Sequence, residues 1–241
     1  MTAPTFVLGC DLARGGLGLA ILAGDGTVVH AMRRAYAGES GDERTAGDPL
    51  DWWRAARTGI KELLRRAKLK PDQIRCLGVT GDDACVLIDN EGRSLANATL
   101  GADPRAASAL EELHKAVGAR TLLNLTGGTA STAATAVKLL MLRATEKRAW
   151  HDLHQVLGAK DFLRFKLTGT LATDATDAAS TLLFNPKMRT WSKQVLNLLG
   201  FQSEWFPPVS DGKSLAGRVT EAAARDTGLA AGTPVITGAG H

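Results

Sequence analysis

The opening of the chain carries the pattern that most constrains its fold. Two apolar runs, 6–11 and 17–22, are separated by a short glycine-containing turn, which predicts a β-hairpin. Gly24-Asp25-Gly26 supplies the next tight turn, because glycine reaches positive φ at no steric cost, and residues 27–32 return as a third strand. Three consecutive antiparallel strands are therefore expected at the start of the chain.

A helix and two more strands follow this opening. Residues 39–49 are rich in Gly, Asp and Glu and predict a surface loop. Apolar residues then recur at helical spacing from Trp52 to Leu64, with Asp48 or Asp51 as the cap and Pro71 marking the end. Buried-type strands are predicted at 74–80 and 86–89. The order strand, strand, strand, helix, strand indicates an α/β domain.

The second half of the chain is predicted to be mainly helical. Helical periodicity covers 106–117 and 133–144, two segments that together read as a helical insertion. Asp161 stands at the start of a further helix, where N-capping is the first explanation for a single acid. The remaining predicted elements are helices at 159–167, 191–199 and 221–227 and a short strand at 234–237.

Composition excludes several classes of protein. With 241 residues, 44% of them hydrophobic, the chain can bury one large core or two modest ones. No run of 18 apolar residues and no signal-like N-terminus is present, so we expect no membrane partner and a cytoplasmic location. The net charge of +4 comes from scattered basic residues, and aromatics make up only 5%, which argues against nucleic-acid binding.

The three cysteines, Cys10, Cys76 and Cys85, stand far apart in the chain. They have no CxxC spacing and no nearby histidines, which argues against a zinc site and a disulfide framework. We expect each to be a small buried hydrophobe.

Acidic residues at predicted strand ends are the first candidates for chemistry. Asp11 ends the first strand beside Gly15 and Gly16, where a carboxylate can hold Mg²⁺ through water, or can simply cap the turn. Asp82 and Asp83 follow the strand at 74–80, where carboxylates can accept hydrogen bonds from sugar hydroxyls, or can form an ordinary acidic turn.

Asp103 and Arg105 form a second kind of candidate. The arginine can offer a two-pronged hydrogen bond to an anion, and a structural salt bridge between the two residues is an equal alternative.

A set of motifs at fixed spacing identifies a family. The most specific are KDFLRFKLTG at 160–169, TDATD at 173–177, TLLF at 181–184 and Trp191-Ser192. With GLAAGTPV at 228–235 and DPRA at 103–106, they resemble the N-terminal domain of the FGGY carbohydrate kinases, the group that contains xylulokinase, gluconate kinase and glycerol kinase. The resemblance runs from about Phe6 to Gly240.

The resemblance implies a fold and a reaction. The fold is an actin-like, ribonuclease-H-type α/β domain, with a mixed five-stranded sheet flanked by helices and a helical insertion. In the family two such domains enclose a cleft, so residues 1–241 would be the sugar-binding half, with the C-terminal nucleotide-binding domain absent from the chain. The reaction would be transfer of the γ-phosphoryl group of ATP to a sugar or polyol hydroxyl, with Mg²⁺ neutralising charge. The isolated half would be inactive, and a homodimer is allowed.

Individual roles follow only where residues match. Asp11 matches the family's magnesium-side aspartate, which binds the ion through water. Arg14, Gly15 and Gly16 stand at the turn that meets the nucleotide phosphates, although the usual GTT-like sequence is replaced. Asp82 falls in the substrate loop that reads Gln-Met-His in xylulokinases.

The remaining matched positions also depart from the pattern. Asp83 belongs to the same altered loop, and Asp103 and Arg105 match a WxDxRA motif with Gly101 at the position of the tryptophan. Substrate contacts are implied for all three charged residues.

His241 stands where the family carries its catalytic aspartate. It can accept a proton near neutral pH, or it can be the first residue of a purification tag. Together with the altered loop and turn, it supports an alternative in which the protein is a catalytically impaired sugar-binding or regulatory homologue. A chaperone-like ATPase of the wider actin-like superfamily lacks any matching motif.

Overall fold

A mixed six-stranded sheet forms the centre of the molecule. The computed structural model describes residues 5–36 and 45–240. In this sheet β1, β2 and β3 are antiparallel neighbours, as the two turn signals predict, whereas β5 lies parallel to both β1 and β14. The strand order, with bounds, is β13 (Leu215–Arg218), β14 (Pro234–Ile236), β5 (Ile74–Gly81), β1 (Phe6–Ala13), β2 (Gly16–Ala23) and β3 (Val28–Arg34).

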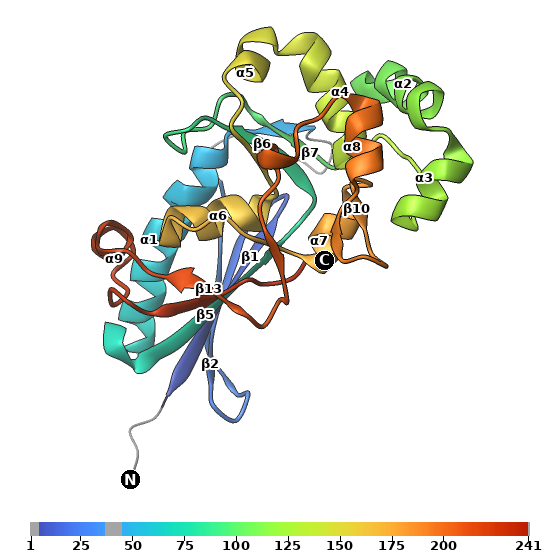
Figure 1. Cartoon of the computed structure of the whole chain (residues 1–241). Coiled ribbons are helices and arrows are strands. Elements are labelled where there is room, and N and C mark those ends of the chain that lie inside the picture. Colours follow the sequence, from blue (N-terminus) through green and yellow to red (C-terminus); the bar gives the residue numbers. More distant parts are fainter. Residues whose placement is uncertain (1–4, 37–44, 241) are drawn as a thin grey trace.

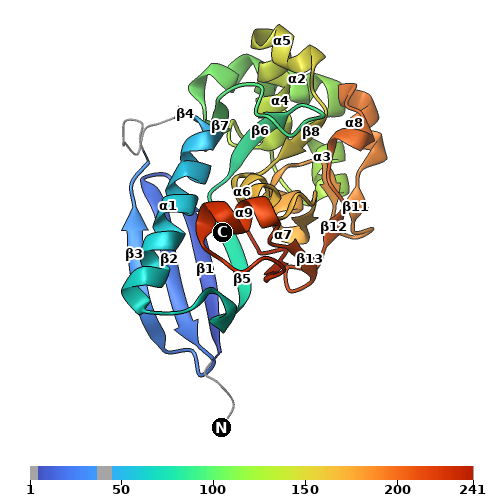
Figure 2. The same cartoon turned by 90° about the vertical axis from the view of Figure 1, so that its left-hand side faces the viewer.

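Three helices cover one face of this sheet (Figure 2). They are α1 (Pro49–Ala67), α6 (Ala159–Thr168) and α9 (Glu221–Thr227). Alternate residues of β1, such as Leu8 and Leu12, point into the core beneath the helices, whereas Val7, the residue before Leu8, is 41% exposed. Burial of the apolar stripe of α1 is the main source of stability here. The opposite face of the sheet stays uncovered by these helices.

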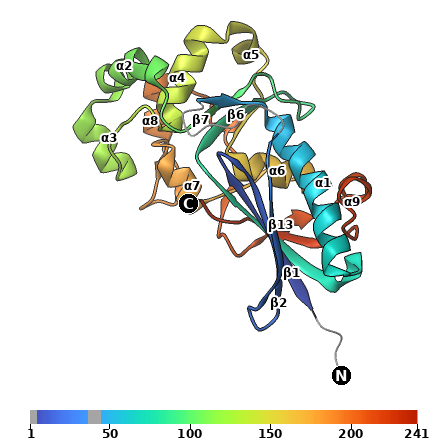
Figure 3. The ribbon, with the colours of Figure 1, turned by 180° about the vertical axis from the view of Figure 1, so that it is seen from behind.

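A smaller sheet and a group of helices build a second core at one end of the central sheet (Figures 1 and 3). The strand β5 leads directly into it through Asp82 and Asp83. Its strands, in order, are β4 (Ala46–Gly47), β7 (Ala98–Leu100), β6 (Ala84–Ile88) and β8 (Gln155–Leu157). Its helices are α2 (Ala107–Val117), α3 (Ala119–Thr126), α4 (Thr135–Thr145), α5 (Lys147–His151) and α8 (Lys193–Leu199).

Short elements connect the two cores. The helix α7 (Ala175–Ser180) begins where the side chain of Asp174 accepts a hydrogen bond from the Thr176 backbone N–H. The short strands are β9 (Thr173–Asp174), β10 (Phe184–Asn185), β11 (Thr190–Trp191) and β12 (Val209–Ser210).

Most predicted elements are confirmed, and the differences have local causes. The α/β class, the three opening strands and the helical insertion are present. The central sheet has six strands and not five, because the segment 215–218, for which the sequence predicts no element, pairs with β14 as an edge strand. The helix α3 was not predicted. Trp191 belongs to β11, since Ser192 caps the helix that follows by accepting from the Val195 N–H.

The capping predictions had mixed outcomes. Asp48 caps α1, where its side chain accepts a hydrogen bond from the Leu50 N–H at 2.9 Å. Asp161 was wrongly expected to be a cap, because Gly158 takes that position at the start of α6 and Asp161 lies buried inside the helix. Of the predicted surface loop 39–49, residues 39–44 lie outside the described part of the chain.

Two further predictions concern the cysteines and membranes. Cys10 and Cys85 are buried and Cys76 is half-buried, all three as free thiols, so the prediction of small buried residues is confirmed for the first two and holds in part for the third. Among residues 5–36 and 45–240, no helix is both long and apolar enough to cross a membrane.

Candidate functional site

Asp11 lies near the carboxyl end of β1, between Gly18 of β2 and Thr80 of β5. Its neighbours line a cavity of about 940 Å³ over the uncovered face of the central sheet, which we call the sheet cavity. Gly238 and Ala239, near the end of the chain, line the same cavity. The structure therefore brings the predicted magnesium-side aspartate and the predicted catalytic end of the chain to one hollow.

The residues around Asp11 fit a weakly held Mg²⁺. In the part of the chain that the structure describes, no group of three or more His, Cys, Asp or Glu side chains could hold a metal ion. Mg²⁺ usually keeps several waters and binds through one or two carboxylates plus substrate phosphates. Asp11 lines the sheet cavity together with Asp174 and Asp211. A carboxylate that opens onto a large cavity suits such an ion when a triphosphate accompanies it.

Arg14 lines a pocket beside the loop after β5 and is not among the residues that line the sheet cavity. Its backbone N–H donates to Asp82 Oδ2 at 2.8 Å, which ties the first hairpin turn to the loop after β5. Its guanidinium lies over Gly101, where an added Cβ would overlap it. Gly101 also has a φ of +47°, in the left-handed region that favours glycine. Glycine is therefore favoured at position 101 for two separate reasons.

The two glycines after Arg14 complete the hairpin turn and contact the third strand. Gly15 lies against the Arg33 guanidinium and Gly16 beneath the Arg34 carbonyl. Both are thus held at the end of the sheet beside the turn.

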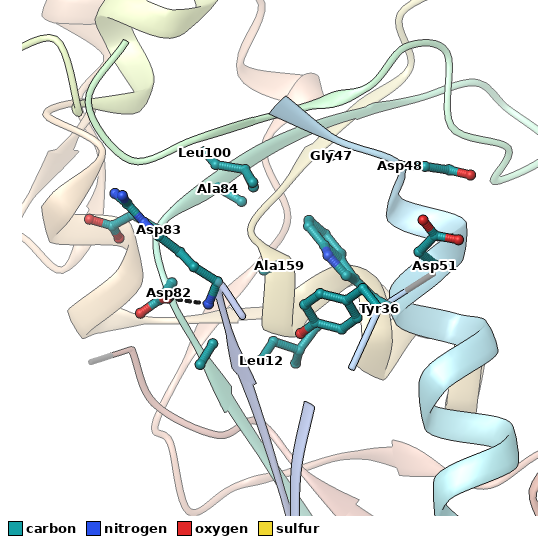
Figure 4. A pocket seen from close by; sticks show the side chains of 13 residues that line it. Leu12, Tyr36, Gly47, Asp48, Asp51, Asp82, Asp83, Ala84, Leu100 and Ala159 are labelled. Atoms are coloured by element: carbon teal, nitrogen blue, oxygen red, sulfur yellow. Dashed lines mark hydrogen bonds between the residues drawn. The ribbon is translucent and has the colours of Figure 1, made fainter. Parts of the chain in front are cut away.

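Asp82 and Asp83 lie at the junction of the two cores and line two pockets. The first, which we call the Arg14 pocket, is also lined by Arg14 and Trp52. Figure 4 shows Asp82 and Asp83 on one side of it and Asp48 and Asp51 on the other, and its dashed line is the bond from Arg14 to Asp82.

The second pocket is lined by Asp177 and is called the Asp177 pocket. Asp82 and Asp83 form part of one wall, and Trp191 and Phe206 contribute aromatic surface. Carboxylates accept hydrogen bonds from hydroxyl groups, and an apolar ring packs against C–H groups. An amphipathic polyol fits this combination.

Asp103 and Arg105 form an internal ion pair. The Asp103 side chain is fully buried, and both of its carboxylate oxygens accept hydrogen bonds from the Arg105 guanidinium at 2.7 to 3.1 Å. Hydrogen bonding to Arg105 lowers the pKa of Asp103. The two residues thus form the structural salt bridge that the sequence allowed as one alternative. A substrate contact by Asp103 or Arg105 stays a prediction.

Sequence reasoning gave no role to a buried charge cluster around Lys160. The Lys160 ammonium, fully buried, lies 2.6 Å from Asp161, 2.9 Å from Asp174 and 2.9 Å from Asp177. Burial alone would lower the pKa of Lys160, but the nearby carboxylates, Asp161 first, outweigh it and raise the pKa. The signal was present in the sequence, since all four residues belong to the motifs at 160–169 and 173–177.

A second cation in this cluster joins it to the end of the chain. Arg164, also fully buried, donates to Asp161 Oδ1 at 2.8 Å and to the Thr237 carbonyl at 2.7 Å. The cluster therefore fixes the strand that precedes the terminal glycines.

The last described residues run between the sheet cavity and the Asp177 pocket. Thr80 Oγ1 donates to the Ala239 carbonyl at 2.7 Å, and the Gly240 N–H donates to Thr176 Oγ1 at 3.0 Å. His241, the predicted base, lies outside the described residues.

Comparison with known proteins agrees with the resemblance. The model of the N-terminal domain of the FGGY family of carbohydrate kinases matches residues 6–241. Xylulose kinase of Staphylococcus epidermidis is 28% identical over 240 residues, covering 97% of this chain and 47% of that protein. Autoinducer-2 kinase of Escherichia coli is 30% identical over 192 residues, covering 78% of this chain and 36% of its relative.

Solved structures give the same answer for the fold. Xylulose kinase from Rhodospirillum rubrum superposes with a TM-score of 0.90 at 26% identity, over 98% of this chain and 49% of its own. Gluconate kinase from Lactobacillus acidophilus superposes with a TM-score of 0.89 at 22% identity, over 99% of this chain and 48% of its own. At this identity the likeness supports the fold alone. The predicted actin-like, ribonuclease-H-type fold is confirmed. This chain spans about half the length of these relatives, and it belongs to the FGGY family of carbohydrate kinases, whose N-terminal domain it matches.

Proposed function

We propose that the protein carrying this chain transfers the γ-phosphoryl group of ATP to a hydroxyl group of a sugar or polyol, and that this chain holds the acceptor. One observation carries the proposal: Asp82 and Asp83 line the Asp177 pocket, Asp11 lines the sheet cavity, and the terminal run 238–240 lines that cavity and lies against Asp177. An acceptor and a metal-bound phosphate would meet across that run. The kinase names of several relatives support the same reaction.

The acceptor would bind in the Asp177 pocket. Its hydroxyl groups would donate to Asp82 and Asp83, and its carbon skeleton would lie against Trp191. A pentulose is the first class to test, because several relatives are named xylulose kinase. Asp82 and Asp83 stand where xylulokinases carry the Gln-Met-His loop. The proposal therefore includes other sugars and polyols as acceptors.

Asp11 would hold Mg²⁺ through water, and the ion would neutralise charge on the phosphates. Gly15 and Gly16 are proposed to approach the phosphates at the hairpin turn. Arg14 was expected beside them, but its guanidinium lies over Gly101, so we propose a role for it on the acceptor side. Catalysis of this type depends mainly on positioning and charge stabilisation.

A second domain would supply most of the nucleotide contacts. The chain covers about half of its relatives, and the sheet cavity opens on the uncovered apolar face of the central sheet. We propose that a nucleotide-binding domain packs toward that face and delivers ATP to Asp11.

The test is turnover by the encoded full-length protein with ATP and a panel of pentuloses and polyols, followed as ADP release. Turnover of at least one acceptor is expected, and no turnover on any member would overturn the proposal. The alternative of an impaired sugar-binding homologue depends on His241 and on the altered loop and turn. For this alternative His241→Asp discriminates: an impaired kinase gains rate, whereas a homologue that lost other parts does not.

A further inference from the structure

Asp177 lies where the acceptor pocket meets the end of the chain. One carboxylate oxygen, Oδ2, pairs with the Lys160 ammonium at 2.9 Å. The other, Oδ1, lies directly over Gly240, where a side chain would overlap it. Asp177 also lines the pocket that holds Asp82 and Asp83. This second oxygen thus sits beside the residue that precedes the expected position of the family's base.

Asp177 is the most accessible of the three carboxylates around Lys160. Its side chain is 19% exposed, against 3% for those of Asp161 and Asp174. Asp161 is further tied to Arg164, and Asp174 accepts hydrogen bonds at the start of α7. A small molecule in the pocket could therefore reach Asp177 more easily than the other two.

The charge of the cluster leaves room for one proton. Among the residues that the structure describes, three carboxylates surround two cations, Lys160 and Arg164, which leaves the cluster with one excess negative charge. Burial raises the pKa of Asp177 to about 6 in spite of the Lys160 ammonium, whereas hydrogen bonds from Thr176 and the charge of Lys160 outweigh burial and lower the pKa of Asp174. A carboxylate that releases and takes up a proton near neutral pH is suited to general base catalysis.

We propose that Asp177 receives the proton of the acceptor hydroxyl during phosphoryl transfer, an assignment that rests on the proposed function. The hydroxyl O–H bond breaks and the proton moves to Asp177 Oδ1. The hydroxyl oxygen forms a bond to the γ-phosphorus of ATP, and the bond between that phosphorus and the β–γ bridging oxygen breaks to release ADP. Lys160 would hold Oδ2 and so orient Oδ1 toward the pocket.

The test compares pH–rate profiles of the full-length wild type with those of Asp177→Asn and Asp174→Asn. The control removes a different Lys160 partner and keeps the helix cap, since asparagine also caps. We expect Asp177→Asn to lower kcat about 100-fold or more, to remove the fall in rate below about pH 6, and to change KM for the acceptor little. Asp174→Asn should retain that fall in rate at low pH, which is the acid limb of the profile.

The competing base is His241. If His241→Gln loses the acid limb while Asp177→Asn keeps it, the assignment is overturned. A wild type without turnover overturns the proposed function and the assignment with it, whereas turnover that survives Asp177→Asn overturns the assignment alone.

A direct titration gives a readout that needs no turnover. Carboxyl ¹³C NMR of this chain should give Asp177 a midpoint near pH 6. A midpoint near the ordinary aspartate value of about 4 would contradict the role.

Discussion

Gly101 and Arg14 illustrate how two departures from a family pattern depend on one another. The arginine replaces part of the usual turn, and its guanidinium occupies the space that a side chain at position 101 would need. A residue larger than glycine at 101 therefore requires both a left-handed backbone and displacement of Arg14. The missing tryptophan of the motif at 101–106 is explained by this contact.

We predict that Gly101→Ala lowers the free energy of unfolding by about 2 kcal/mol in the wild type but by only about 1 kcal/mol in an Arg14→Ala background. The difference is the overlap with the guanidinium. Gly169→Ala is the matched control, because Gly169 has a φ of +69° with no atom within 4 Å of an added Cβ. Urea unfolding of the four variants measures the coupling, and equal losses in both backgrounds would contradict it.

A substitution of Asp83 tests the proposed acceptor pocket. Asp83 lines the Asp177 pocket, and its Oδ1 accepts a hydrogen bond from Ser180 at 3.3 Å. Asp83→Ala should weaken binding of the acceptor about 10- to 100-fold, because a hydrogen bond to a charged group contributes about 1.5–3 kcal/mol.

Isothermal titration of the acceptor into the Asp83→Ala variant measures this loss. Asp72→Ala, at an exposed turn far from the pocket, is the control and should bind as the wild type does. Unchanged affinity of the Asp83 variant would remove this residue from the acceptor site.

At the scale of elements, α6 is unusual because it buries two cations. Its Lys160 and Arg164 side chains are fully buried, and carboxylates from α6, β9 and α7 pair with them. Removal of one partner from a buried charge group costs more than the group adds to stability, since it leaves an uncompensated charge. The helix is therefore held in place by the elements that supply its counter-ions.

Lys160→Met should lower the free energy of unfolding by about 3–5 kcal/mol at pH 7. The loss should shrink as the pH falls toward 4, because the carboxylates left without a partner then become protonated. In the wild type the raised pKa of Lys160 keeps its contribution present at neutral pH and loses it only at alkaline pH. Lys166→Met, on the same helix but half-buried, is the control. A loss of the same size at both pH values would contradict this account.

At the scale of the whole molecule, two cores meet at the loop of Asp82 and Asp83. The Arg14 and Asp177 pockets, where we propose that the acceptor binds, lie at this junction, whereas the sheet cavity opens on an uncovered face. We therefore expect that the isolated chain can bind the acceptor without being able to transfer phosphate to it.

We predict that the isolated chain binds the acceptor of the full-length protein with a Kd within about tenfold of that protein, yet transfers no phosphate from ATP above background. Calorimetric titration and coupled ADP release measure the two properties. Failure of the isolated chain to bind an acceptor that the full-length protein phosphorylates would mean that the acceptor site needs the second domain.

The sequence alone determined what depends on local pattern. Turn glycines and apolar alternation identified the opening strands, and helical spacing with Asp48 identified α1. Motif spacing at 160–191 identified the family, because each motif keeps residue types at fixed offsets.

Only the tertiary structure decided which distant side chains meet. Asp177 reaches Lys160 and Gly240, and Arg14 reaches Gly101, across 17, 63 and 87 residues of chain, the differences between their positions. The edge strand β13 likewise exists because β14 lies beside it. Local propensity acts over a few residues, whereas such pairings are set by how helices and sheets pack around the two cores, which no pattern within a short window contains.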